Sequence, residues 1–85
     1  AAPLAVRFYA ADSEGVTSLI CNGREIAMTR SEPSGHSVAR VLLGPTELCR
    51  VSSAGKVRTY SYDSLAPGRP DAAGERIVHI RFHKR

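Results

Sequence analysis

Three side chains near the C-terminus have the types that acid–base chemistry needs. A ribonuclease-like site uses a carboxylate or histidine base, a histidine acid and an arginine on one surface, and Glu75, His79 and Arg81 could supply them. These residue types are common, so the match is not specific. A small secreted ribonuclease or toxin is therefore kept as an alternative function.

Metal and cofactor sites find little support. His79 and His83 are four residues apart, roughly 13 Å along a strand, which is too far for both to bind one ion. The two cysteines form no Cys-x-x-Cys motif, and the chain contains no glycine-rich phosphate loop and no serine elbow. We expect no metal, no cofactor and no enzymatic activity.

The uneven distribution of charge is the clearest functional signal. Residues 1–48 carry four basic and five acidic side chains, a net of −1, whereas residues 49–85 carry eight basic and three acidic ones, a net of +5. If segments 56–62 and 75–82 pair as neighbouring strands, their alternate residues share one basic and aromatic surface. This surface is predicted to bind a partner through Lys56, Arg58, Tyr60, Tyr62, His79, Arg81 and His83.

Two alternatives to this binding surface stay open. Tyr60 and Tyr62 could instead belong to the core, with the charges merely solvating a sheet edge. Basic β surfaces bind acidic proteins as well as nucleic acids, so a protein partner is the expectation and nucleic acid the weaker one. The irregular segment 64–74 also contains Arg69 and Pro70, which suggests a protease-inhibitor loop, although proline after arginine makes a poor scissile bond.

Short strands must position these residues. Apolar and polar side chains alternate over segments 4–10, 16–21, 24–30, 37–43, 48–53, 56–62 and 75–82. Asn22 and Gly23 mark a type I′ hairpin, and Ala54 and Gly55 separate a second strand pair. No helix is favoured. The pattern predicts one domain over residues 1–85, an all-β, six- to seven-stranded antiparallel β-sandwich or small barrel with one disulfide.

The expected core follows from the alternation within each strand. It comprises Leu4, Val6, Phe8, Leu19, Ile26, Met28, Val41, Leu43, Val51, Val57, Val78, Ile80 and Phe82.

Cys21 and Cys49 are expected to form the disulfide, the alternative being two buried free thiols. Closing this loop stabilises the fold by roughly 3–4 kcal/mol in the chain-entropy description. The chain begins at Ala1 without an initiator methionine, as after removal of a signal peptide, and disulfides are typical of small secreted domains. We expect a secreted protein. No apolar run approaches the roughly 20 residues that span a bilayer, so membrane insertion is not expected.

The predicted disulfide, the six or so short strands and the basic surface together resemble the MAX effectors of plant-pathogenic fungi. Those proteins are secreted β-sandwiches of two three-stranded sheets that share one disulfide. Cys49 suits the family's second cysteine, whereas Cys21 follows the predicted first strand, and the family's first cysteine usually lies in or near that strand. The resemblance implies a virulence or avirulence factor delivered into a host cell, where it binds a host protein, sometimes through an exposed strand edge. It assigns no functional residue.

Overall fold

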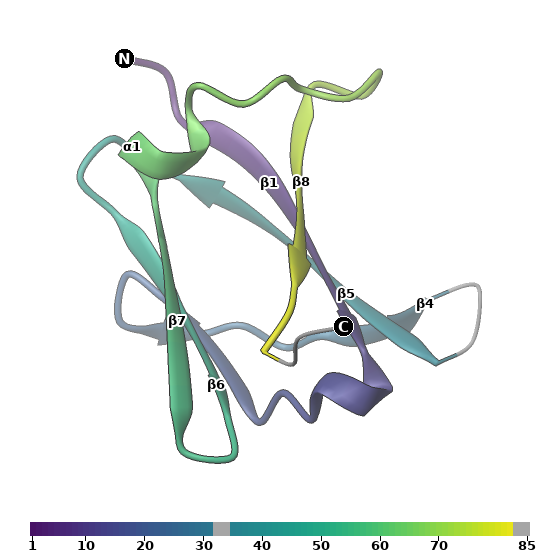
Figure 1. Cartoon of the computed structure of the whole chain (residues 1–85). Coiled ribbons are helices and arrows are strands. Elements are labelled where there is room, and N and C mark those ends of the chain that lie inside the picture. Colours follow the sequence, from purple (N-terminus) through teal and green to yellow (C-terminus); the bar gives the residue numbers. More distant parts are fainter. Residues whose placement is uncertain (32–34, 83–85) are drawn as a thin grey trace.

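The computed structural model describes residues 1–31 and 35–82, whose strands form two four-stranded sheets (Figure 1). Sheet A has the strand order β4 (Thr29–Ser31), β5 (His36–Leu43), β1 (Leu4–Ala11) and β8 (Glu75–Ile80). Sheet B has the order β3 (Arg24–Glu25), β2 (Ser18–Cys21), β6 (Leu48–Ser53) and β7 (Lys56–Ser61). A 3₁₀ turn, η1 (Asp12–Glu14), follows β1, and a short helix, α1 (Tyr62–Leu65), follows β7. The predicted all-β fold class is confirmed.

The chain departs from a purely antiparallel arrangement at one place. β1 and β8 run parallel, from Ala5 opposite Glu75 to Ala10 opposite Ile80, whereas the other strand pairs are antiparallel. Parallel neighbours need a long connection, which the body of the chain supplies because these strands lie near its two ends. Each sheet has four strands, where the resemblance to MAX effectors implied three.

The predicted strand over residues 24–30 is wrong, because residues 26–28 leave sheet B and cross to sheet A. β3 therefore pairs with β2, and β4 pairs with β5. Ile26 and Met28 pack against the core from this link, so their apolar side chains are still partly buried. The prediction that no helix forms is also wrong at α1, where Ser61 and Ser64 form a reciprocal capping box.

The core lies between the inner faces of the two sheets. Nine of the predicted core residues are buried, namely Leu4, Val6, Phe8, Leu19, Leu43, Val51, Val78, Ile80 and Phe82. Val57 is 58% exposed, so its prediction as a core residue is wrong. Side chains alternate between the faces of a strand, and β7 turns Tyr60 inward, which leaves Val57 on the outer face.

The predicted disulfide between Cys21 and Cys49 is present. The two residues lie directly opposite each other on β2 and β6, and both are buried. The bond therefore joins neighbouring strands of sheet B and ties the β2–β3 hairpin to the basic C-terminal half of the chain. Within the described residues, no helix is long and apolar enough to cross a membrane.

Candidate protein-binding edge

β7 is the end strand of sheet B, and β8 is the end strand of sheet A (Figure 1). Because the three-residue link between β3 and β4 closes the opposite side of the sandwich, β7 and β8 lie on the same side. No strand in the described part of the chain pairs with their outer edges. We call these two unpaired edges the β7–β8 seam.

The hydrogen-bond pattern of the β6–β7 hairpin decides which backbone groups of β7 point into the seam. A two-residue turn joins the strands, so the flanking residues, Ser53 and Lys56, form a hydrogen-bonded pair. Bonded and non-bonded pairs alternate along an antiparallel ladder. Val57 and Thr59 therefore direct their N–H and C=O groups away from β6, where a further strand could bind them.

The inward face of β7 carries cationic and aromatic side chains. The ring of Tyr60 packs edge-on against Phe8, with ring centroids 5.5 Å apart. The guanidinium of Arg58 lies 5.6 Å from the ring centroid of Phe82, which follows β8. Arg58 thus reaches across the seam while its side chain stays exposed. Lys56 lies two residues earlier on the same face of β7 and is also exposed. The seam is therefore positively charged along its β7 side.

The outward face of sheet B is partly apolar. Val57 is the most exposed of three apolar side chains there, at 58% against 38% for Ile20 and 39% for Leu48. Exposed edges are usually protected by charge, by proline or by a covering element. β7 has charged residues on its inner face, but its outer face presents Val57 and Thr59 to solvent.

The predicted partner-binding surface does not form on one sheet. It required pairing between segments 56–62 and 75–82, and that pairing is wrong because β7 and β8 belong to different sheets. His79 lies on the outer face of sheet A with its ring stacked on Tyr9, at a centroid distance of 5.6 Å. Tyr62 begins α1, and its hydroxyl donates to the Ala2 carbonyl at 2.7 Å.

Some of the predicted partner-binding residues do lie together, along the β7–β8 seam. Lys56 and Arg58 line its β7 side, and Arg81, which is exposed, precedes the Phe82 ring that Arg58 contacts. His83 lies outside the described residues. The binding role of all these residues stays a prediction.

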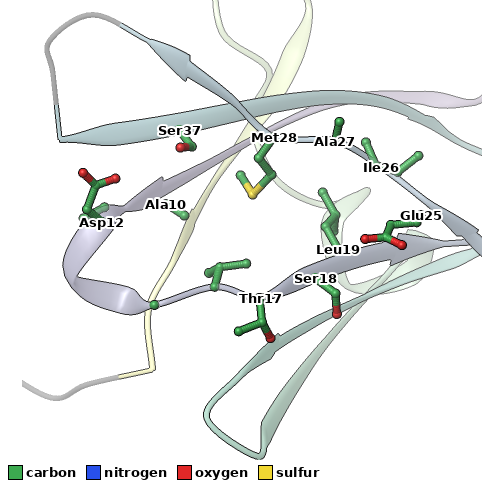
Figure 2. Close-up of a pocket in the computed structure, with 13 residues that line it drawn as sticks. Ala10, Asp12, Thr17, Ser18, Leu19, Glu25, Ile26, Ala27, Met28 and Ser37 are labelled. Carbon is green, nitrogen blue, oxygen red and sulfur yellow. The ribbon is translucent and has the colours of Figure 1, made fainter.

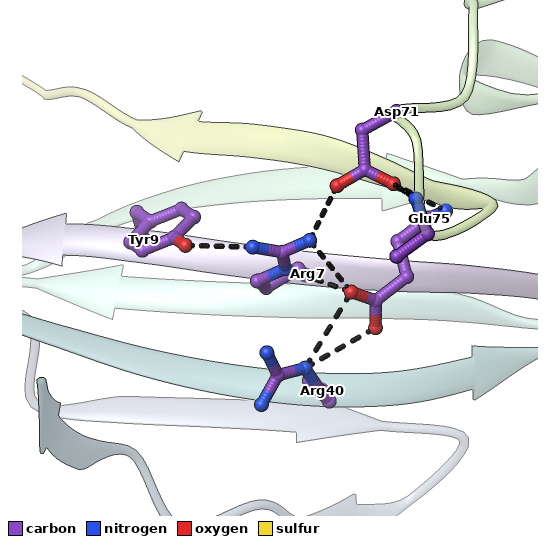
Figure 3. A network of polar contacts seen from close by, with 6 residues as sticks. Arg7, Tyr9, Arg40, Asp71 and Glu75 are labelled. Atoms are coloured by element: carbon purple, nitrogen blue, oxygen red, sulfur yellow. Dashed lines mark hydrogen bonds and ion pairs between the residues drawn. The ribbon is translucent and has the colours of Figure 1, made fainter.

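A second polar cluster covers the outer face of sheet A (Figure 3). Arg7 on β1 is bound on three sides: its Nε donates to Glu75 Oε1 at 2.8 Å, its Nη1 donates to the Tyr9 hydroxyl at 2.9 Å, and its Nη2 forms an ion pair with Asp71. Arg40 Nε lies 3.3 Å from Glu75 Oε2. These opposite charges neutralise one another. Their contacts hold the segment before β8 against β1. No sequence pattern indicates this cluster, because Arg7 lies more than 60 residues from its two carboxylate partners, Asp71 and Glu75.

The pKa values that shift in this region have structural causes. The backbone N–H of Glu75, then that of Ala73, donates to Asp71, and these bonds, together with Arg7, lower the pKa of the Asp71 carboxyl despite partial desolvation. The hydrogen bond with Tyr9 is the main cause that raises the pKa of Arg7. Burial raises the pKa of Tyr60, and the nearby Arg58 opposes that shift. The pKa shifts of Arg7 and Asp71 both favour the charged forms that make their ion pair.

The residues of the alternative nuclease site are not assembled. Glu75 is held by Arg7 and Arg40, whereas His79 stacks on Tyr9 four positions along the same strand. This spacing corresponds to roughly 13 Å on a strand, which is too far for the two side chains to act on the attacking and leaving oxygens of one phosphodiester group. Across residues 1–31 and 35–82, no three histidine, cysteine, aspartate or glutamate side chains are grouped to hold a metal ion.

The segment proposed as an inhibitor loop is anchored on both sides of its exposed residues. The Arg76 side chain donates to the Ala66 carbonyl at 2.8 Å, and Asp71 is held by Arg7. Arg69 and Pro70 lie exposed between these anchors. The inhibitor function stays a prediction.

Comparisons with protein-family models, with curated proteins and with solved structures find no match to this chain.

Proposed function

We propose that this chain is a secreted binding protein without enzymatic activity, which holds an acidic, extended segment of a partner protein against the outer edge of β7. One observation carries the proposal. The backbone groups of Val57 and Thr59 point away from sheet B on a strand that also exposes Lys56 and Arg58. The combination offers main-chain hydrogen bonds for affinity and positive charge for selectivity.

Strand addition sets the pattern of the partner segment. Side chains of an added strand alternate between the two faces of the sheet, as those of β7 do. Residues opposite Lys56 and Arg58 would be aspartate or glutamate, because opposite charges on facing strands attract. Residues opposite Val57 and Thr59 would be β-branched, because they extend the apolar outer face. The proposed ligand alternates acidic and β-branched residues.

The same charges argue against a second copy of this chain as the partner. If two β7 strands paired antiparallel about Arg58, each Arg58 would face its equivalent, and Lys56 would add further positive charge. Like charges directly opposite each other destabilise a strand pair. The edge is therefore suited to an acidic strand of a different protein.

We further propose that the partner belongs to a host, as the resemblance to MAX effectors implies. The buried disulfide supports action after secretion, since such bonds persist in oxidising compartments. A protein partner is favoured over nucleic acid because the aromatic ring of this edge, Tyr60, is partly buried against the core and Phe8, whereas base stacking uses exposed rings.

Calorimetric titration with an alternating peptide, acetyl-Thr-Asp-Val-Glu-Val-Asp-Thr-amide, tests the proposal. Thr59→Pro removes the outward N–H that the added strand needs, and proline is tolerated at such edge positions. We expect at least a tenfold weaker affinity in this variant, from one lost backbone bond and the blocked approach. Thr59→Val keeps the N–H and should bind like the wild type.

Charge is tested separately. Lys56→Glu should weaken binding of the acidic peptide, and the affinity of the wild type should fall as salt is added. A peptide with lysine at each acidic position is the matched control and should not bind. Equal affinity of Thr59→Pro and Thr59→Val, or tighter binding of single-stranded RNA than of the acidic peptide, would contradict the proposed function.

A further inference from the structure

The outer edge of β8 can accept a further strand over part of its length. Both backbone groups of Glu75 are bonded to Asp71: the Glu75 N–H donates to Asp71 Oδ1 at 2.9 Å, and the Glu75 carbonyl accepts from the Asp71 N–H at 2.8 Å. A strand residue directs both groups to one side, and the side alternates along the strand. Glu75 points away from β1, so Ile77 and His79 do too. Within residues 1–31 and 35–82, no other segment pairs with those two residues on that side.

The side chains along this edge suit the same acidic ligand as β7. Ile77, which is 40% exposed, and His79, which is exposed, share the outer face of sheet A. The exposed Arg81 follows the strand and forms no ion pair with the described residues. A strand added here would be matched by an apolar residue beside Ile77 and an acidic one beside His79 and Arg81.

The two edges of the seam run in opposite directions. The Arg76 side chain, near the start of β8, donates to the carbonyl of Ala66, which follows β7 and α1. Arg58, near the start of β7, lies beside the Phe82 ring, which follows the end of β8. A segment that runs parallel to β8 therefore runs antiparallel to β7 without reversing its direction.

This chain closes the opposite side of the sandwich with one such segment. Residues 24–31 add β3 to sheet B and β4 to sheet A, with residues 26–28 as the link between them. Figure 2 shows Ile26, Ala27 and Met28 of this link, which border a cleft. Stacked sheets lie about 10 Å apart, a distance that three extended residues cover. One short segment is therefore enough to pair with an edge strand of each sheet.

We propose that a single acidic segment of the partner protein crosses the β7–β8 seam, pairing first with β8 at Ile77 and His79 and then with β7 at Thr59 and Val57. This inference rests on the proposed function and adds β8 to its binding site. The crossing passes Arg58, which is exposed and forms no ion pair within the described part of the chain, so a carboxylate is expected in the link.

The test uses one peptide that can reach both edges and a control that can pair with β7 alone. In acetyl-Val-Thr-Glu-Gly-Asp-Gly-Val-Glu-Val-Asp-Thr-amide, the crossing peptide, Val-Thr-Glu is placed for β8, Gly-Asp-Gly crosses, and the remainder pairs with β7. In the control peptide, proline replaces the first threonine. It removes the N–H that would donate to the Ile77 carbonyl and leaves the charge unchanged.

Amide hydrogen exchange locates each contact. Saturation with the crossing peptide should slow exchange at Ile77 and His79 by about tenfold or more, whereas the control peptide should slow it only at Val57 and Thr59. If the crossing peptide protects Val57 and Thr59 but leaves Ile77 and His79 unchanged, the crossing is wrong and the proposed function stands. Protection at none of the four positions would overturn both.

Substitutions at Ile77 test the same contact by calorimetry. Ile77→Pro removes the outward N–H, and proline is tolerated at such edge positions. It should weaken binding of the crossing peptide roughly three- to tenfold, to the affinity of the control peptide, whereas Ile77→Val keeps the N–H and the affinity. An amide spectrum that matches the wild type confirms that each variant is folded. Equal affinity of the two variants for the crossing peptide would show that β8 does not bind it.

Discussion

At the residue scale, the two hairpin turns each place a non-glycine residue in the left-handed backbone region, but the residue types differ. Asn22 has φ 52° and Ala54 has φ 49°, and each precedes a glycine with positive φ. The Cβ of either residue crowds the following carbonyl, but asparagine tolerates this left-handed region better than alanine because its short polar side chain can form local hydrogen bonds. Ala54 is therefore a strained residue at the tip of the proposed binding edge.

Replacing Ala54 should stabilise the protein. We expect Ala54→Asn to raise the free energy of unfolding by about 0.5–1 kcal/mol, because it relieves part of the left-handed penalty. Urea denaturation measures the change. Asn22→Ala makes the reverse exchange in the other hairpin and should lower the free energy of unfolding. A loss of stability in Ala54→Asn would show that the turn conformation is not the one described.

The Asp71 carboxyl should make stability depend on acid pH. Its pKa is lowered in the folded state, so the stability it contributes is fully present above its usual value of 3.8 and is lost as pH falls through the folded pKa. We expect Asp71→Asn to be less stable than the wild type at neutral pH, and the difference to shrink in acid. Thermal unfolding across this pH range measures it. A difference that does not change with pH would contradict the assignment, and Asp63→Asn serves as the control for removing a carboxylate.

At the element scale, the disulfide joins two hairpins. Cys21 ends β2 just before its turn, and Cys49 lies on β6, which forms the other hairpin with β7. Replacing both cysteines with alanine should lower the free energy of unfolding by roughly 3–4 kcal/mol, the loop-closure value for a separation of 28 residues. Chemical denaturation without reductant tests this. A loss below about 1 kcal/mol would indicate that the sheet alone fixes these strands.

Elements that depend on neighbouring residues in the chain could be predicted from the sequence. Elements that depend on contacts between distant segments could not. The hairpins at Gly23 and Gly55 were predicted because turn residues and strand partners are close in the chain. The division of residues 24–30 between two sheets depends on the packing of Ile26 and Met28 against the core. The parallel contact of β1 with β8 joins the two ends of the chain, and alternation within a strand does not specify its neighbour.

At the scale of the whole molecule, basic side chains lie along the side where both sheets end in an unpaired strand. The β7–β8 seam on this side exposes Lys56 and Arg58. The sequence predicted a basic C-terminal half, but it could not place that charge, because β7 and β8 were assumed to pair. The charge lies instead along an unpaired edge, and Val57, predicted for the core, lies exposed on that edge.

Amide hydrogen exchange at Val57 and Thr59 tests the proposed function most directly. Both N–H groups point away from β6, so in the unbound protein they should exchange faster than that of Arg58, which bonds to β6. Saturation with the alternating acidic peptide should slow exchange at Val57 and Thr59 by about tenfold or more, with little change at Arg58. Unchanged exchange at both positions in the peptide-saturated protein would contradict strand addition at β7.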